Sequence, residues 1–169
     1  LAVSQATQEA ARRATEAVLL PACDALGRVP ARPLVLGGDD LGMILRPDVA
    51  VPFTRAFLES FEEASARQLA PLAAQLGEPL LARGLSAAAG IAIVHASHPL
   101  SAATALAEEL CGQTKRAIKG VAARDAMPPS ALSLRRVTAA LDDQGQPRPS
   151  RGLPAYVLGD HPAGGLPRL

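Results

Sequence analysis

Two adjacent carboxylates follow two glycines in the run Gly37-Gly38-Asp39-Asp40. Apolar runs at 34–36 and 41–45 flank these residues, so the pattern predicts two strands joined by a tight turn with both carboxylates at its tip. The glycines permit positive φ angles and let a ligand approach the backbone closely. Paired acids at such a tip can hold Mg²⁺ or Mn²⁺, and these ions organise phosphoryl transfer. Gly and Asp are also ordinary turn residues, so the four residues alone are equally compatible with a plain surface turn.

A pair of lysines forms a second group that could do chemistry. Lys115 and Lys119 lie four residues apart in a segment predicted to be helical, so they share one helix face. Such a face can contact the phosphates of a nucleotide, or it can be an ordinary solvated basic face. His95 and His98 are interpreted as packed or hydrogen-bonded side chains, which histidines at the end of a strand are more often than ligands.

Two helices are predicted in the first half of the chain, on either side of the hairpin. The first covers 4–26, with Ser4 as its cap and Pro21 ending or kinking it. The second begins with Asp48 as its N-cap, and Pro71 breaks up the stretch that follows. One buried face of the second helix is marked by aromatic residues at every fourth position, Phe53, Phe57 and Phe61.

The second half of the chain is predicted to alternate strands with one helix. The helix covers 100–123, starts after Pro99 and takes Ser97 as its cap. Three strands are expected, at 85–95, 130–138 and 154–158. The basic pairs Arg12-Arg13 and Arg135-Arg136 are interpreted as solvated, and Asp142-Asp143 as part of a polar loop.

The order helix, hairpin, helix, strand, helix, strand predicts an α+β fold, in which helices cover one face of an antiparallel sheet. The ferredoxin-like split βαβ is the simplest arrangement of this kind. It lacks one strand here, the one that should precede the first helix. We expect one domain over 1–160 and a flexible tail over 161–169, which is rich in Gly and Pro.

Composition limits the classes of function. The chain has 169 residues and only 2% aromatic residues, so its core must be built from Ala, Leu and Val. A net charge of +1 gives no strong overall field of the kind that marks a bulk nucleic-acid binder, although a local basic patch is compatible with it. Cys23 and Cys111 lack the spacing of a zinc site and are expected to be free thiols in a reducing cytoplasm. No apolar stretch is long enough to span a membrane, and the first twenty residues do not form a signal peptide.

Several segments together resemble the palm domain of the CRISPR polymerase, found in the large subunit of type III CRISPR effector complexes. The run 34–41 resembles its GGDD hairpin, and 89–100 resembles its second signature, a strand followed by a His-Pro-Leu helix start. The segment 114–120 lies where related diguanylate cyclase (GGDEF) domains carry a phosphate-binding lysine. The run 128–132 is similar to palm-only relatives of the CRISPR subunit. The resemblance extends over roughly 4–138.

The resemblance implies a palm fold, two-metal nucleotidyl transfer and synthesis of cyclic oligoadenylates from ATP in antiviral defence. Asp39 and Asp40 would hold Mg²⁺ or Mn²⁺. Gly37, Gly38, Lys115 and Lys119 would contact the nucleoside triphosphate. Other CRISPR effector subunits, RNA and a second copy of the chain are the further partners that it suggests.

One feature of the family pattern is missing from this sequence. Family palms also take a metal-binding Asp from the strand before the first helix, whereas the first acidic residue here is Glu9. Either an upstream segment supplies that residue, or the palm is inactive and serves as a nucleotide sensor or assembly module. A diguanylate cyclase is less compatible, since the motif ends in Asp and a His-Pro-Leu segment is present.

Overall fold

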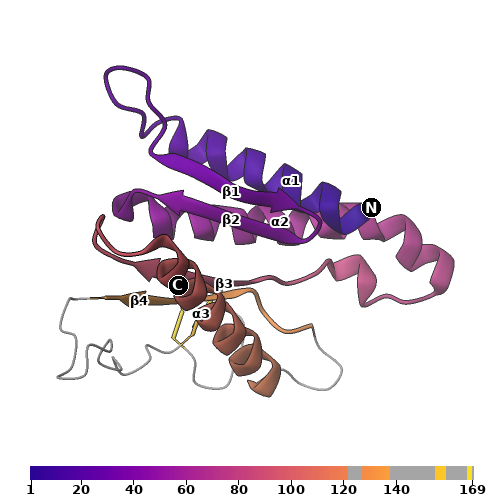
Figure 1. Ribbon diagram of the computed structural model, residues 1–169. Coiled ribbons are helices and arrows are strands. Elements are labelled where there is room, and N and C mark those ends of the chain that lie inside the picture. Colours follow the sequence, from indigo (N-terminus) through magenta and orange to yellow (C-terminus); the bar gives the residue numbers. More distant parts are fainter. Residues whose placement is uncertain (122–126, 138–154, 159–166, 169) are drawn as a thin grey trace.

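The computed structural model describes residues 1–121, 127–137, 155–158 and 167–168 (Figure 1). Helix α1 (Ala2–Ala14) continues into a short π-helix, η1 (Thr15–Leu19), and a loop then leads to strands β1 (Ala31–Gly37) and β2 (Asp40–Leu45). The long helix α2 (Pro47–Leu76) and the 3-10 turn η2 (Leu81–Arg83) precede β3 (Ala88–Ile93). Helix α3 (Leu100–Val121) follows, then β4 (Ala131–Arg136) and β5 (Tyr156–Val157).

The strands form two separate sheets. β1 and β2 pair as an antiparallel hairpin, while the second sheet has the order β3-β4-β5. β3 and β4 are parallel, and β4 and β5 are antiparallel. The α+β class is therefore confirmed. The sheet is not antiparallel throughout as expected, because α3 crosses over between β3 and β4 and makes these neighbours parallel.

The helices lie on both sides of the strands rather than on one face. α1 and α2 lie behind the hairpin, and α3 lies in front of β3 and β4 (Figure 1). Two consecutive residues show this division, since successive side chains of an extended chain point to opposite faces. Ala87 packs against the cluster around Phe61 of α2, whereas Ala88 packs against the cluster around Ile118 of α3.

Small side chains let α1 and α2 pack closely. Ala6 and Ala10 of α1 contact Phe61 and Ala64 of α2 in a fully buried cluster. The predicted aromatic face is confirmed: Phe53 and Phe61 are buried, and the ring of Phe57 stacks on that of Phe61 with centroids 6.2 Å apart. The core thus depends on alanines and a few aromatic rings, as the composition indicated.

The first two helices differ from their predicted limits. The first helical stretch ends at Leu19, just before Pro21. Its last turn has the wider π pattern, in which the N–H of Leu20 bonds to the oxygen of Thr15. Pro71 does not break α2, which runs on to Leu76. A proline removes only one helical hydrogen bond, and buried residues on both sides of Pro71 hold this turn of the helix in place.

The predicted helix caps are wrong. α1 begins at Ala2, before Ser4, and Asp48 lies in the first turn of α2, where it pairs with Arg46 at the N-cap. Ser97 bonds to His95, and α3 starts directly after Pro99 instead. Ser97 thus found a local side-chain partner rather than the free amides of the helix end.

The predicted strands are present in shorter form, at the bounds given above. The loop containing Asp142 and Asp143 lies outside the described residues, as does the tail apart from Pro167 and Arg168, and Arg168 forms a β-bridge with Val157. Among the described helices, none has the length and apolar character needed to cross a membrane. Cys23 and Cys111 are both free, as expected.

Candidate functional site

The GGDD residues form the tip of the β1–β2 hairpin, as the sequence predicted. Gly37 pairs with Asp40, and Gly38 and Asp39 form the two-residue turn between them. Gly38 has a φ of 63°, while Asp39 does not have a positive φ, which is the pattern of a type II′ hairpin turn. A glycine is therefore required at 38, and the turn places Asp39 and Asp40 next to each other at an exposed end.

The tip has room for a cation and a ligand. Asp39 and Asp40 are both exposed, and a Cβ atom added at Gly37 or Gly38 would meet no other atom within 4 Å. Carboxylate oxygens are the hard donors that Mg²⁺ and Mn²⁺ prefer. These residues fit a divalent cation in donor type and access, but they supply only two carboxylates. No group of three or more metal-ligating side chains occurs in the part of the chain that the structure describes.

Asp40 faces the side of the molecule on which α3 lies. The alternate residues Leu41, Met43 and Leu45 of β2 pack toward α1 and α2. Because successive strand residues point to opposite faces, Asp40, Gly42 and Ile44 face the other side. The exposure of Asp40 and Ile44 agrees with this assignment.

Close packing at Gly90 holds α3 against β3. A Cβ atom there would lie 2.1 Å from the oxygen of Ala107 and 2.5 Å from the nitrogen of Cys111, so only glycine allows this approach. The Cys111 thiol donates to the oxygen of Ala88 at 3.2 Å. One turn further, the fully buried Thr114 hydroxyl lies 2.7 Å from the Ser133 hydroxyl and 3.2 Å from the oxygen of Ala89. These contacts fix the middle of α3 on the sheet.

The Cys111 thiol is affected by one residue of each of the two groups singled out in the sequence. Burial raises the pKa of Cys111 above its ordinary value, the positive charge of Lys115 acts to lower it, and the negative charge of Asp40 acts to raise it further. Asp40 and Lys115 are therefore both within electrostatic reach of one half-buried thiol. The fold thus brings a carboxylate of the hairpin and a lysine of α3 to the same region.

The hairpin tip lies toward the end of the molecule at which β3 begins. Cys111, which is in electrostatic reach of Asp40, bonds to Ala88, the first residue of β3. The reason is that α2 carries the chain back along the molecule, so β2 and β3 point the same way and begin at the same end (Figure 1). The His-Pro-Leu segment after β3 consequently lies at the other end.

The remaining candidate residues are less closely tied to the tip. Lys115 and Lys119 are exposed and form no ion pair with any described residue. Lys119 lies one turn beyond Lys115, farther from Cys111 along the helix. His95 is hydrogen-bonded to Ser97 at 2.8 Å, as interpreted from the sequence. Arg12 and Arg13 form exposed ion pairs, whereas Arg135 is half-buried, so it is not the fully solvated residue that we expected.

Two strand edges next to the site are unpaired. Among the described residues, β2 pairs only with β1 and β3 pairs only with β4, so no ladder joins β2 to β3. The outer edge of β1 contains Pro33 and a bulge at Pro33/Val35, two features that discourage further pairing. The segments 40–45 and 88–93 contain no proline and no charge other than Asp40, so these inner edges lack such protection.

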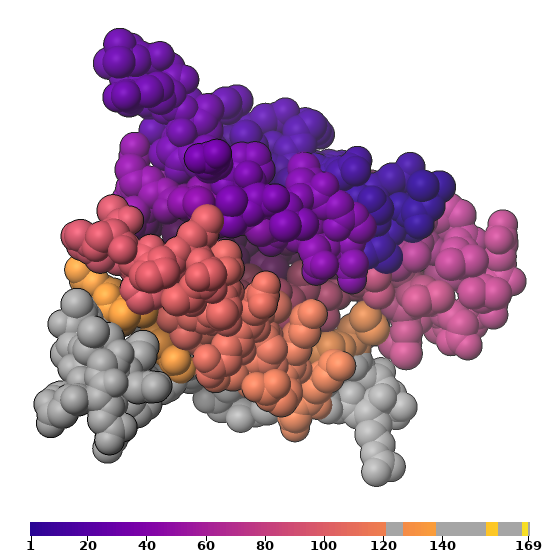
Figure 2. Space-filling model, viewed as in Figure 1, coloured from indigo at the N-terminus to yellow at the C-terminus, as the bar shows by residue number. Residues whose placement is uncertain are grey.

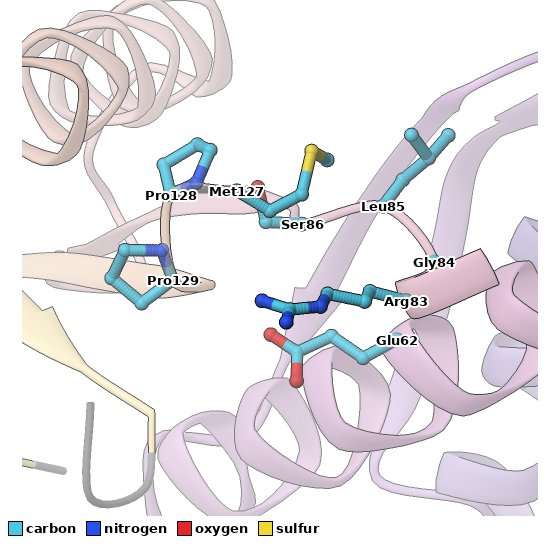
Figure 3. Close-up of a pocket in the computed structure, with 8 residues that line it drawn as sticks. All are labelled: Glu62, Arg83, Gly84, Leu85, Ser86, Met127, Pro128 and Pro129. Carbon is cyan, nitrogen blue, oxygen red and sulfur yellow. The ribbon is translucent and has the colours of Figure 1, made fainter. Parts of the chain in front are cut away.

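A small pocket lies apart from the hairpin tip. It encloses about 180 Å³ between α2, the segment before β3 and the segment before β4. Arg83 and Glu62 extend toward one another on one side, and Pro128 and Pro129 lie across from them (Figure 3). None of the GGDD residues, nor Lys115 or Lys119, lines this pocket.

The sequence reasoning missed the residues that hold α3 in place. Gly90 and Thr114 carry no catalytic pattern, but signals for both were present. A glycine inside an apolar strand indicates close approach of another backbone, and the repeat Leu110, Thr114, Ile118 at every fourth position marks the buried face of α3.

Comparison with known family models assigns a family to most of the chain. A family model described as Cas10/Cmr2, second palm domain, matches residues 2–127, which is most of the 169-residue chain. The matched region includes the hairpin tip, α2, β3 and all of α3. A search of curated proteins found no significant match.

Proposed function

Because the chain belongs to the Cas10/Cmr2 second palm domain family, a palm of type III CRISPR systems, we propose that it is a metal-dependent nucleotidyltransferase. The substrate would be ATP, and the product a cyclic oligoadenylate used in antiviral defence in the cytoplasm. The observation that carries this proposal is the exposed hairpin tip that places Asp39 and Asp40 next to each other within the matched region. We treat residues 1–160 as one palm domain.

The residues have distinct roles in this proposal. Asp39 and Asp40 would hold Mg²⁺ or Mn²⁺, which when bound would offset phosphate charge and favour deprotonation of an attacking 3′-hydroxyl. The open backbone at Gly37 and Gly38 would let the triphosphate approach the hairpin. Lys115, and beyond it Lys119, would donate to phosphate oxygens as mobile point charges.

A third carboxylate would come from a strand paired between β2 and β3. Two strands that point the same way, are joined through α2 and do not pair form a split βαβ unit, which normally encloses one strand. The unprotected inner edges of β2 and β3 support this proposal. Such a strand would lie directly beside Asp40, the first residue of β2. Other effector subunits and RNA would bind the completed assembly.

Calorimetry with a non-hydrolysable ATP analogue and Mg²⁺ tests the proposal. Asp39→Ala combined with Asp40→Ala should weaken binding strongly. The matched control is Glu16→Ala with Glu59→Ala, which removes the same charge from exposed acids of η1 and α2. Equal affinity in wild type, double variant and control would show that the hairpin is only a surface turn.

An inactive palm is the second candidate, favoured by the presence of only two carboxylates at the tip among the described residues. In that case the chain would be a nucleotide sensor or assembly module. Incubation with ATP and Mn²⁺, followed by separation of the products, distinguishes an active nucleotidyltransferase from an inactive palm. Binding that depends on Asp39 and Asp40, without any new phosphodiester product, would support the sensor.

A further inference from the structure

The small pocket beside α2 contains two opposite charges that have no charged partner. Arg83 and Glu62 extend toward one another on one side of it (Figure 3), yet neither forms an ion pair with any described residue. We call these two side chains the polar edge of the pocket. The hairpin and α3 lie on the face that Figure 2 shows, whereas α2 lies behind the hairpin, so the pocket is separate from the GGDD tip.

The backbone that carries Arg83 is fixed against α2. Gly84 has a φ of 82°, and a Cβ atom there would lie 2.6 Å from the backbone oxygen of Glu62, so only glycine allows this approach. Ser65, which is 1% exposed, accepts a hydrogen bond from the N–H of Leu85 at 2.8 Å. The two residues after Arg83 therefore lie directly on the turn of α2 that carries Glu62, and backbone contacts set where both charged side chains begin.

The far wall of the pocket is fixed through Glu62 as well. Its carboxylate accepts from the N–H of Ser130 at 3.2 Å, and the Ser130 hydroxyl accepts from the N–H of Ala87 at 3.0 Å. These bonds connect the three segments that form the pocket. A carboxylate has about four acceptor positions, so Glu62 retains acceptors for a ligand. A site whose walls are ordered in advance binds at a lower entropic cost.

The wall across from the polar edge is mostly apolar. Pro128 and Pro129 lie there (Figure 3), and Met127 lies next to them in the chain. The volume of about 180 Å³ is below the roughly 300 Å³ at which pockets for drug-sized ligands begin, so it suits a single ring system. Proline rings and a thioether can cover the faces of a flat ring. Its edge would then meet Arg83 and Glu62.

Guanine matches the polar edge in both its acceptors and its donors. Its O6 and N7 atoms accept from a guanidinium, which is the commonest specific contact between arginine and a base. Its N1–H and 2-amino groups are donors that suit a carboxylate. Adenine and cytosine offer these two side chains fewer bonds. A zwitterionic amino acid can also meet both charges, but its own two charges must then leave water, a cost that a neutral base avoids.

We propose that this pocket binds a guanine base, with Arg83 at O6 and N7 and Glu62 at N1 and the 2-amino group. The base would lie between the polar edge and the prolines, and the small volume leaves the sugar and phosphate outside. A free guanine nucleotide and a guanine of single-stranded RNA share this chemistry. The pocket would thus recognise a base at a distance from the proposed nucleotidyl-transfer site.

NMR titration of the full 169-residue chain with GMP in the presence of EDTA tests this proposal. The amides of Gly84, Leu85 and Ser86 should shift, whereas those of Gly38 and Asp39 should not. AMP, which has the same sugar and phosphate, should bind at least about tenfold more weakly. EDTA removes divalent cations, so the result does not depend on metal-assisted binding at the hairpin.

Two variants assign the contacts. Glu62→Gln keeps an acceptor for the Ser130 N–H but loses the charge, and it should weaken GMP binding at least about tenfold. It should also abolish the preference for GMP over IMP, which lacks the 2-amino group. Arg83→Ala, at an exposed side chain, should weaken GMP binding to a similar extent without lowering the melting temperature. The matched controls are Glu108→Gln and Arg32→Ala, at exposed positions outside the pocket, and both should bind GMP as wild type does.

Three results would overturn the proposal: no amide shift at about 5 mM GMP, equal affinity for GMP and AMP, or unchanged affinity in folded Arg83→Ala. The last measurement stands even if Glu62→Gln does not fold. A short single-stranded RNA with one guanine among uracils identifies the source of the base. Tighter binding of this RNA than of GMP assigns RNA as the ligand, whereas equal or weaker binding assigns the free nucleotide.

Discussion

At the level of single residues, the exposed charges of this protein divide into those with a partner and those without. Arg12, Arg28 and Arg55 each pair with an acid within their own element or loop. Asp39 and Lys115 have no such partner among the described residues and lie at the proposed site. Unpaired charges are available for a ligand, whereas paired ones mainly support local structure.

Lys115→Ala should weaken binding of the ATP analogue by about one to two orders of magnitude, because a charge-assisted contact to phosphate contributes about 1.5–3 kcal/mol. Thermal stability should barely change, since the side chain is exposed. Calorimetry and a melting curve measure the two effects. Arg55→Ala, a cation on α2, is the control, and early unfolding with normal binding of Lys115→Ala would assign it a structural role.

Asp24 should titrate below its ordinary value of 3.8. The backbone hydrogen bond from Arg28 and then the Arg28 side chain lower the pKa of this carboxyl. Since the folded pKa is depressed, the stabilisation of the turn at residues 24–28 is present above pH 3.8 and is lost as pH falls through the folded pKa. NMR titration of the carboxyl carbon measures the midpoint, which Arg28→Ala should raise toward 3.8. An unchanged midpoint in that variant would contradict the assigned contact.

At the level of elements, the packing of α3 on β3 decides whether Lys115 faces the hairpin. The residues of α3 alone do not determine this position, because it depends on contacts with the sheet. Its place is fixed by the backbone approach at Gly90 and by the buried hydroxyl of Thr114. A shift of α3 would move Lys115 away from Asp40 without altering either residue.

Gly90→Ala should destabilise the fold by at least about 2 kcal/mol, because the new methyl group would collide with the backbone of Ala107 and Cys111. Urea denaturation gives the change in the free energy of unfolding. Gly42→Ala is the matched control, since a Cβ atom there would meet only Val35 at an ordinary 3.6 Å. Equal stability of the two variants would show that α3 is not held by this contact.

At the level of the whole molecule, the most consequential feature is the separation of the two sheets. β2 and β3 begin at the same end and point the same way, and their facing edges pair with no strand in the described part of the chain. The hairpin tip and α3 are thereby held in one region even though no ladder joins the sheets. The arrangement depends on α2, whose 30 residues connect the end of β2 to the approach to β3.

Hydrogen exchange should reveal the free edge of β3. Ala87 and Ile93 supply carbonyls that accept from β4, so the odd-numbered residues bond to β4 and the even-numbered ones direct their backbone groups away from it. We expect the amides of Gly90 and Ala92 to exchange faster than that of Ile91 in this chain. NMR-detected exchange measures each amide, and equally slow exchange of all three would contradict a free edge.

The sequence by itself determined the local structures. Gly37 and Gly38 between two apolar runs require a hairpin turn, so both acids had to lie at a tip, and the spacing of Phe53, Phe57 and Phe61 had to produce a buried helix face. The α+β class and the palm family also followed from the order and content of these segments. Each of these inferences depends on residues close together in the chain, where steric and periodic rules are strong.

Only the tertiary structure decided which distant elements meet. No periodicity indicated that β3 and β4 are parallel, that α3 lies on the opposite side from α1 and α2, or that β2 and β3 begin toward the same end of the molecule. These features depend on one close backbone contact at Gly90 and on the direction in which α2 returns the chain. Both are long-range packing outcomes, and sequence spacing carries no direct record of them, because many arrangements bury the same apolar faces equally well.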